Sequence, residues 1–352
     1  MIQRKRWIDV AKGIGILLVI LGHMNRFFEY DGRLNQMVYS VQLPIFLIIG
    51  GYWAERREGE GFRSFLSKKF YRLVQPYFLF ALFSILYAWP DDQTEFVHYA
   101  VGMLWGIGIR NYLPNLPIWF LTMFFVANLW FYLVLWVGSK GKSKCQSYLL
   151  EGLVVCLIIA GGWKLRERGE RLPWGFELAM ITQGFFYAGH LLKYLEERLE
   201  QSAPGVKRKG QLAEVLLTIP SAALWLLCVW RNGRVDINAS WFGNQGLWCF
   251  YLASFFGCYL LVVLSRILAH CSPITWVLSL FGKNSMVIMA VHVPMLIWLD
   301  GVITPLMPDI IKMNHMTKNW IGVTYNFVVI SLLSLFVSLL LKPNPYRKTQ
   351  KM

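Results

Sequence analysis

The sequence predicts an all-α fold, a polytopic transmembrane helix bundle of about ten spans with both termini in the cytoplasm. Of its 352 residues, 56% are hydrophobic and only 16% are charged, whereas a soluble domain carries about 25% charged residues. The apolar residues gather in runs, and about 17 to 25 such residues cross the bilayer core. Lys and Arg are about twice as frequent in loops on the N-terminal side of the membrane as in the opposite loops, which indicates a cytoplasmic N-terminus.

Each apolar run defines one predicted span, and an even number of spans places both termini on the same side. The ten segments are residues 8–28, 36–54, 74–90, 118–137, 148–163, 176–192, 212–230, 246–268, 276–298 and 320–341. The third and fifth segments are short for a full crossing. The apolar stretch 96–109 is expected to be a re-entrant or surface helix. Residues 1–341 are therefore predicted to form one membrane domain, followed by a short basic cytoplasmic tail at 342–352.

Charge and cysteine usage exclude other classes of protein. The net charge of +15 comes from basic residues that lie between apolar segments, as in cytoplasmic loops, and not on one face that could bind nucleic acid. The six cysteines contain no CxxC pair, which argues against a disulfide framework and a zinc site. Three basic residues, Arg4 to Arg6, precede the first apolar run, but no small-residue cleavage site follows it, so we expect a retained signal anchor.

The first span carries polar residues that a lipid-facing helix would exclude. Lys12 and His23 are eleven residues apart, which places them within about 20° of each other and about 16 Å apart along an α-helix. Asp9 falls on the same stripe. Ionisable residues inside a membrane are costly unless they face the bundle interior or a wet cavity, and they mark functional sites by default. The sequence therefore predicts a functional cavity beside this face.

Five motifs follow one another along nearly the whole chain. They are RWIDVAKGIGILLVILGH at 6–23, LPIFLIIGGYW at 43–53, KKFYRLVQPYF at 68–78, IWFL at 118–121 and FGKNSMVIMAVHVP at 281–294. This succession resembles acyltransferase family 3, in the branch similar to fucose 4-O-acetylases and bacterial polysaccharide O-acetyltransferases. The resemblance implies an integral enzyme of the plasma membrane that moves an acyl group, usually acetyl from acetyl-CoA, onto a sugar hydroxyl.

The resemblance also implies partners and site residues. Acyl-CoA is the expected donor on the cytoplasmic side, with no tightly bound cofactor or metal, and a glycan or lipid-linked sugar is the expected acceptor, with glycan-assembly proteins as further partners. Lys12 and His23 match the family's first-helix signature of a basic residue, ten others and His. Lys69 and Arg72 match its second basic motif. Gly50 stands where the family usually has Ser, so this chain must function without that hydroxyl.

The chemistry of the residues agrees with acyl transfer. A base must take the proton of the acceptor hydroxyl, and His is suited to this at neutral pH, so His23 is the candidate. Lys12 either binds a phosphate or pairs with Asp9. Coenzyme A carries phosphates that Lys and Arg can hold, which favours Lys69 and Arg72, together with their neighbour Lys68, as donor-binding residues. The positive-inside rule alone also explains this basic cluster.

Four residues are expected on the substrate-binding side of the cavity. They are His292, Asn284, Trp119 and Asp9. His292 and Asn284 share the ninth span, where they either line the cavity or satisfy hydrogen bonds between helices. Trp119 either stacks against a sugar ring or belongs to the aromatic belt of the membrane interface.

Two other hypotheses compete with this one. In the first, the protein is a transporter or flippase for a glycan, a lipid-linked sugar or an acyl group, and Asp9, Lys12 and His23 form a polar relay. The lack of an evident inverted repeat counts against it. In the second, the protein is a membrane-bound O-acyltransferase of the lipid- or protein-modifying type. The catalytic His of that family lies late in the chain, which would make His292 catalytic and His23 structural.

Overall fold

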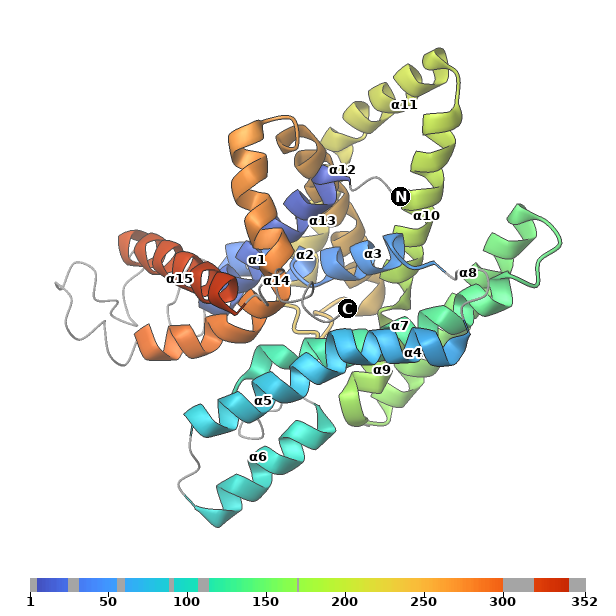
Figure 1. Ribbon diagram of the computed structural model, residues 1–352. Coiled ribbons are helices and arrows are strands. Elements are labelled where there is room, and N and C mark those ends of the chain that lie inside the picture. The colour runs from blue at the N-terminus through green and yellow to red at the C-terminus, as the bar shows by residue number, and fades with distance from the viewer. Residues whose placement is uncertain are drawn as a thin grey trace, which may run out of the picture. The chain divides into compact units, whose positions relative to one another are not determined.

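The computed structural model is helical, which confirms the predicted all-α bundle (Figure 1). It describes residues 5–24, 32–55, 61–88, 92–106, 114–169, 171–299 and 320–341. Within these ranges the strand-like pairing is limited to an isolated bridge between Asp236 and Trp241. The chain divides into two compact units, and each is described by itself. One comprises Met1–Val38 and Leu264–Met352, and the other comprises Tyr39–Val263.

Eight helices in the described part of the chain are long and apolar enough to cross a membrane. They are Arg6–Met24, Gly32–Tyr52, Leu116–Gly138, Lys144–Glu167, Pro204–Asn232, Leu247–Leu268, Ser272–Trp298 and Val323–Leu340. They correspond to eight of the ten predicted spans. The other two predicted spans are also helical, but α5 (Gln75–Tyr87) has only 13 residues and α10 (Gln183–Gln201) is charged in its second half. The number of spans and the side of the termini therefore stay predictions.

In the first unit, α1 (Arg6–Met24) packs along α14 (Ser272–Trp298) with the two backbones almost in contact. A Cβ atom added to Gly13 would lie 2.1 Å from the carbonyl oxygen of Leu278, and one added to Gly282 would lie 1.9 Å from the carbonyl oxygen of Asp9. Further along both helices, His23 meets His292. His23 lies ten residues after Gly13, and His292 lies ten residues after Gly282, so α1 and α14 run parallel.

This parallel packing constrains the topology. If α1 and α14 both cross the membrane in the same direction, an odd number of crossings must separate them. Five of the eight candidate helices lie between them, and the ten-span prediction places seven there. Both counts satisfy the condition, whereas a single additional span between the two helices would violate it. The helix α15 (Trp320–Leu340) packs against α14 and α1 and completes the unit.

In the second unit, α3 (Pro44–Tyr52) packs against α10 (Figure 1). The two helices are closest at a pair of glycines. A Cβ atom on Gly51 would lie 1.8 Å from the carbonyl oxygen of Phe186, and one on Gly189 would lie 1.8 Å from that of Ile48. Small residues let membrane helices approach this closely. The helices α7 (Trp119–Gly138), α8 (Lys144–Glu167) and α9 (Phe176–Ile181) pack beside this crossing.

A long helical rod packs against α7 in the same unit. It consists of α4 (Phe62–Lys69), a π-helical turn η1 (Phe70–Val74) and α5, drawn in blue in Figure 1. The next helix, α6 (Gln93–Trp105), covers most of the stretch expected to be a re-entrant or surface helix. Gly106 ends α6 in the left-handed conformation, with φ of 67°, which glycine adopts without steric cost.

The remaining helices of the second unit continue the chain toward α14. They are α11 (Pro204–Leu216), α12 (Thr218–Asn232) and α13 (Leu247–Leu268), the last of which ends in the first unit. Large apolar side chains such as Ile219 and Trp230 on α12 are exposed. Such exposure suits helices whose outer faces contact lipid.

Candidate active site

His23 of α1 and His292 of α14 are in direct contact. The Nε2 atom of His292 lies 3.2 Å from the Nδ1 atom of His23. The rings meet edge to face, with their centroids 4.9 Å apart. His292 has no exposed surface, whereas His23 is half-buried. The two histidines, which the sequence offered as alternative catalytic residues, therefore form one pair.

The hydrogen bonds of this pair indicate which ring nitrogens carry protons. The Nδ1 atom of His292 lies 3.1 Å from the carbonyl oxygen of Ile288, and because a carbonyl only accepts, this nitrogen donates. The Nε2 atom of neutral His292 is then an acceptor. The Nδ1–H group of His23 faces it and also lies 2.8 Å from the carbonyl oxygen of Val19. Neutral His23 therefore carries its lone pair on Nε2.

The close crossing of α1 and α14 positions the histidine pair. His23 lies ten residues after Gly13, and His292 lies ten residues after Gly282, so both reach the same level about 15 Å beyond the glycines. Because the backbones touch at the glycines, the side chains further along are held at a short, defined separation. The glycines thus act on the site through helix packing.

Three other predicted site residues lie on the same two helices. Asp9 is buried and Lys12 is half-buried, both near the start of α1. Asn284 is buried, and its side-chain amide donates to the carbonyl oxygen of Leu280 at 2.7 Å. Asn284 lies eight residues before His292, about 12 Å along α14. The first unit therefore contains the histidine pair and a polar region closer to the helix starts.

The predicted donor-binding residues lie in the second unit. The Nζ atom of Lys69 donates to the Oδ1 atom of Asn128 on α7 at 2.5 Å and lies 5.5 Å from the ring centre of Phe65. Lys68 and Arg72 are exposed. Arg72 lies in η1, and such π-helical turns occur frequently at functional sites. Lys69 is thus held in place, while its two basic neighbours face outward.

Trp119 begins α7 and is 6% exposed, with Phe120 6.1 Å away between ring centroids. This burial does not fit the aromatic belt, whose residues face the membrane interface. A role for Trp119 in sugar binding stays a prediction.

In the described part of the chain, no group of three His, Cys, Asp or Glu side chains is placed to hold a metal ion.

Comparison with known proteins identifies the family. A family model described as an acyltransferase domain, that of acyltransferase family 3, matches residues 5–342. The chain belongs to acyltransferase family 3. No curated protein and no solved structure matched it. The protein is therefore an acyltransferase, and its apolar helices make it a multi-pass membrane protein.

Sequence reasoning missed three features of this acyltransferase. It did not connect His23 with His292, because the two residues lie 269 positions apart. It also overlooked Asn128, the partner of Lys69, and the π-helical turn that follows Lys69. Asn128 carried a usable signal, because a polar side chain within an apolar span needs a hydrogen-bonding partner.

Proposed function

We propose that this membrane acyltransferase moves a short acyl group, with acetyl as the first candidate, from acyl-CoA to a hydroxyl of a sugar. The acceptor is a cell-surface glycan or its lipid-linked precursor, and His23 is the general base. The observation that supports this role is the hydrogen-bonded series from Ile288 through His292 to His23, which assigns the lone pair of His23 to Nε2.

The proposed reaction needs two proton transfers, one to His23 and one from it. The Nε2 atom of His23 takes the proton of the sugar hydroxyl as its oxygen attacks the carbonyl carbon of the thioester. A C–O bond forms, and the C–S bond then breaks as the tetrahedral intermediate collapses. The imidazolium returns the proton to the departing sulfur, so coenzyme A leaves as a free thiol. A positioned base of this kind contributes roughly 10²- to 10⁴-fold to the rate.

His292 acts in this proposal as a positioning residue. It is fully buried, and its Nε2 faces His23, so it is poorly placed to reach an acceptor hydroxyl. By accepting the Nδ1–H of His23, it favours the tautomer with the lone pair on Nε2 and orients the ring. This geometry supports His23 over His292 as the base, and hence the family 3 mechanism over the alternative with a late catalytic His.

The donor is proposed to bind from the cytoplasm. Lys68, Lys69 and Arg72 supply the positive charge for its phosphates, and Lys12 contacts a phosphate or assists His23. Asp9, Asn284 and Trp119 are proposed to contact the acceptor. In this scheme the protein lies in the plasma membrane with both termini in the cytoplasm.

Thiol release by the purified, detergent-solubilised protein tests the proposal. Wild type is expected to release thiol from acetyl-CoA in the presence of sugar acceptors, and His23→Ala is expected to release it no faster than the uncatalysed background. A normal unfolding midpoint must accompany the loss. Full activity of His23→Ala, or no turnover of any short acyl-CoA by wild type, contradicts the proposal.

A further inference from the structure

A second polar site lies in the Tyr39–Val263 unit. A cavity of about 310 Å³ opens between the end of α3, the end of α7, the start of α8 and the middle of α10. Its walls include Tyr148, Glu151, His190, Lys193 and Tyr194. None of these residues takes part in the proposed acyl transfer. The volume is at the lower end of the range for small-molecule sites, which is about 300 to 1,000 Å³.

Two buried polar atoms in the wall of this cavity, Oε2 of Glu151 and Nδ1 of His190, have no hydrogen-bond partner among the described residues. Glu151 is 5% exposed, and no described residue hydrogen-bonds its buried Oε2 atom. The nearest polar partner is Nε2 of His190 at 3.5 Å, which is beyond ordinary hydrogen-bond length. The Oε1 atom packs against the backbone of Gly138, where no side chain would fit. A buried acceptor without a donor is costly, so a ligand that donates there would relieve the cost.

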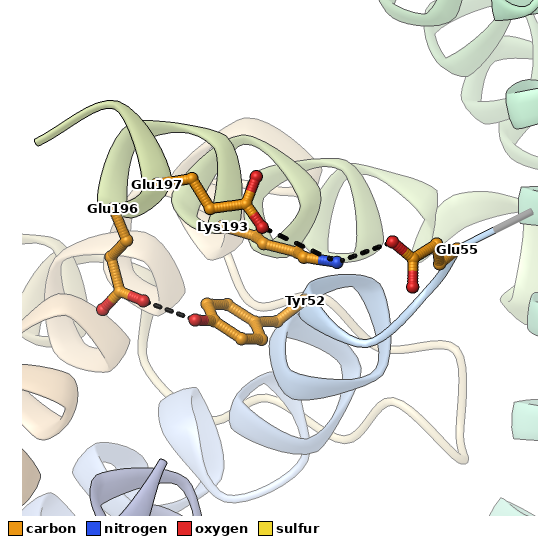
Figure 2. A network of polar contacts seen from close by, with 5 residues as sticks. All are labelled: Tyr52, Glu55, Lys193, Glu196 and Glu197. Carbon is orange, nitrogen blue, oxygen red and sulfur yellow. Dashed lines mark hydrogen bonds and ion pairs between the residues drawn. The ribbon is translucent and has the colours of Figure 1, made fainter. Parts of the chain in front are cut away.

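The charges around the cavity favour a cation. Lys193 lies 3.2 Å from Glu55 and 3.9 Å from Glu197, so it is engaged by two carboxylates (Figure 2). Glu151 adds a third carboxylate to the same lining. The C-terminus of α7, at Gly138, contributes the negative end of a helix dipole. Three carboxylates and one lysine would repel the phosphates of coenzyme A and attract a positive charge.

Aromatic rings form the rest of the wall. The ring centroids of Tyr148 and Tyr194 are 4.6 Å apart, and that of His190 is 5.6 Å from Tyr148. Tyrosine faces attract cations and also cover aliphatic carbon. The hydroxyl of the neighbouring Tyr187 donates to the carbonyl oxygen of Tyr148 at 2.7 Å, which fixes the start of α8 on α10. These contacts hold the aromatic wall of the cavity in a defined position.

From these observations we propose that the cavity binds a small protonated amine. Its ammonium group donates to the Oε2 atom of Glu151, and its carbon chain lies against Tyr148 and Tyr194. A quaternary ammonium ion would not suffice, because it has no N–H group to donate to Glu151. This site is separate from the proposed acyl transfer and does not depend on it.

Binding of 1,4-diaminobutane to the full-length protein in detergent tests this proposal, with calorimetric titration as the readout. The matched neutral probe is 1,4-butanediol, which has the same carbon chain without the charge. We expect saturable binding of the diamine and at least tenfold weaker binding of the diol. Glu151→Gln should weaken diamine binding at least tenfold. Glu196→Gln is the control, because Glu196 accepts from the Tyr52 hydroxyl (Figure 2) and does not line the cavity. The affinity of this variant for the diamine should stay within twofold of the wild-type value.

Several outcomes would overturn the proposal. They are no saturable diamine binding, equal binding of the diol, and unchanged affinity of Glu151→Gln. Displacement of the diamine by acetyl-CoA would assign the cavity to the acyl donor instead. If Glu151→Gln does not fold, Tyr194→Leu replaces it, with a loss of several-fold expected from the missing ring face; an unchanged affinity of that variant also overturns the proposal. The assay needs no enzymatic turnover, so its failure is distinct from failure of the acyltransfer proposal.

Discussion

The Nδ1 atom of His23 and the Nε2 atom of His292 are 3.2 Å apart, which joins the first helix of the chain to a helix near its end. His292 is in turn held by the carbonyl oxygen of Ile288. In the proposed mechanism, this arrangement gives each histidine a different role. The buried one sets the tautomer, and the half-buried one carries the lone pair on its other nitrogen.

The roles of the two histidines predict different kinetics for their variants. His292→Ala should lower kcat by roughly 10- to 100-fold with little change in KM, because His23 remains but loses its orienting partner. His292→Gln should recover part of that loss, since its amide oxygen can accept the Nδ1–H of His23. Thiol release over a range of acetyl-CoA concentrations measures both constants. Identical kcat values for the Ala and Gln variants would argue against a positioning role.

The glycine crossing of α1 and α14 should tolerate no side chain. Gly282→Ala would place a methyl group 1.9 Å from a backbone oxygen, so the helices must separate, and overpacking typically costs about 1 to 3 kcal/mol. We expect a lower thermal unfolding midpoint and reduced activity, because the histidine pair depends on this packing. Gly205→Ala on α11 is the control, since open space surrounds that position and alanine favours helix. Similar midpoints for the two variants would show that the crossing is looser than described.

The motif resemblance places Gly50 where Ser is expected, and the structure leaves little room for a side chain there. A Cβ atom there would lie 2.8 Å from the Phe124 ring and 3.2 Å from that of Phe186. Gly50→Ser should therefore destabilise the protein by about 1 to 3 kcal/mol. Adding Phe124→Leu should restore part of the stability, because the two positions share one space. Thermal unfolding of the single and double variants measures this, and purely additive losses would refute the shared-space explanation.

The parallel course of α1 and α14 predicts the accessibility of one native cysteine. Cys271 precedes α14 and is exposed, so it should lie on the same side as the start of α1, the predicted cytoplasmic side. In a variant that keeps only this cysteine, a membrane-impermeant maleimide should label it in inside-out vesicles and not in intact cells. Ala239→Cys in the same background, in a loop predicted on the other side, should show the reverse. Labelling of Cys271 from outside intact cells would contradict the topology.

The sequence by itself determined the class of the fold and indicated candidate site residues. Apolar runs long enough for a bilayer locate the helices, because backbone groups in lipid must be satisfied within a helix. The spacing of Lys12 and His23 on one helical face, together with the order of the motifs, also indicated the family. Apolar runs and the spacing on one helix are local properties of the chain that helix geometry predicts, whereas the family was indicated by the resemblance of the motifs.

Only the tertiary structure decided which residues meet. The partner of His23 lies 269 positions away, and the partner of Lys69 lies on another helix. The cavity at Glu151 draws its walls from four separate segments. Such contacts depend on how closely helices cross, which the glycines at positions 13, 51, 189 and 282 govern through backbone packing. Hydropathy and spacing describe each helix alone, so they do not specify these pairings.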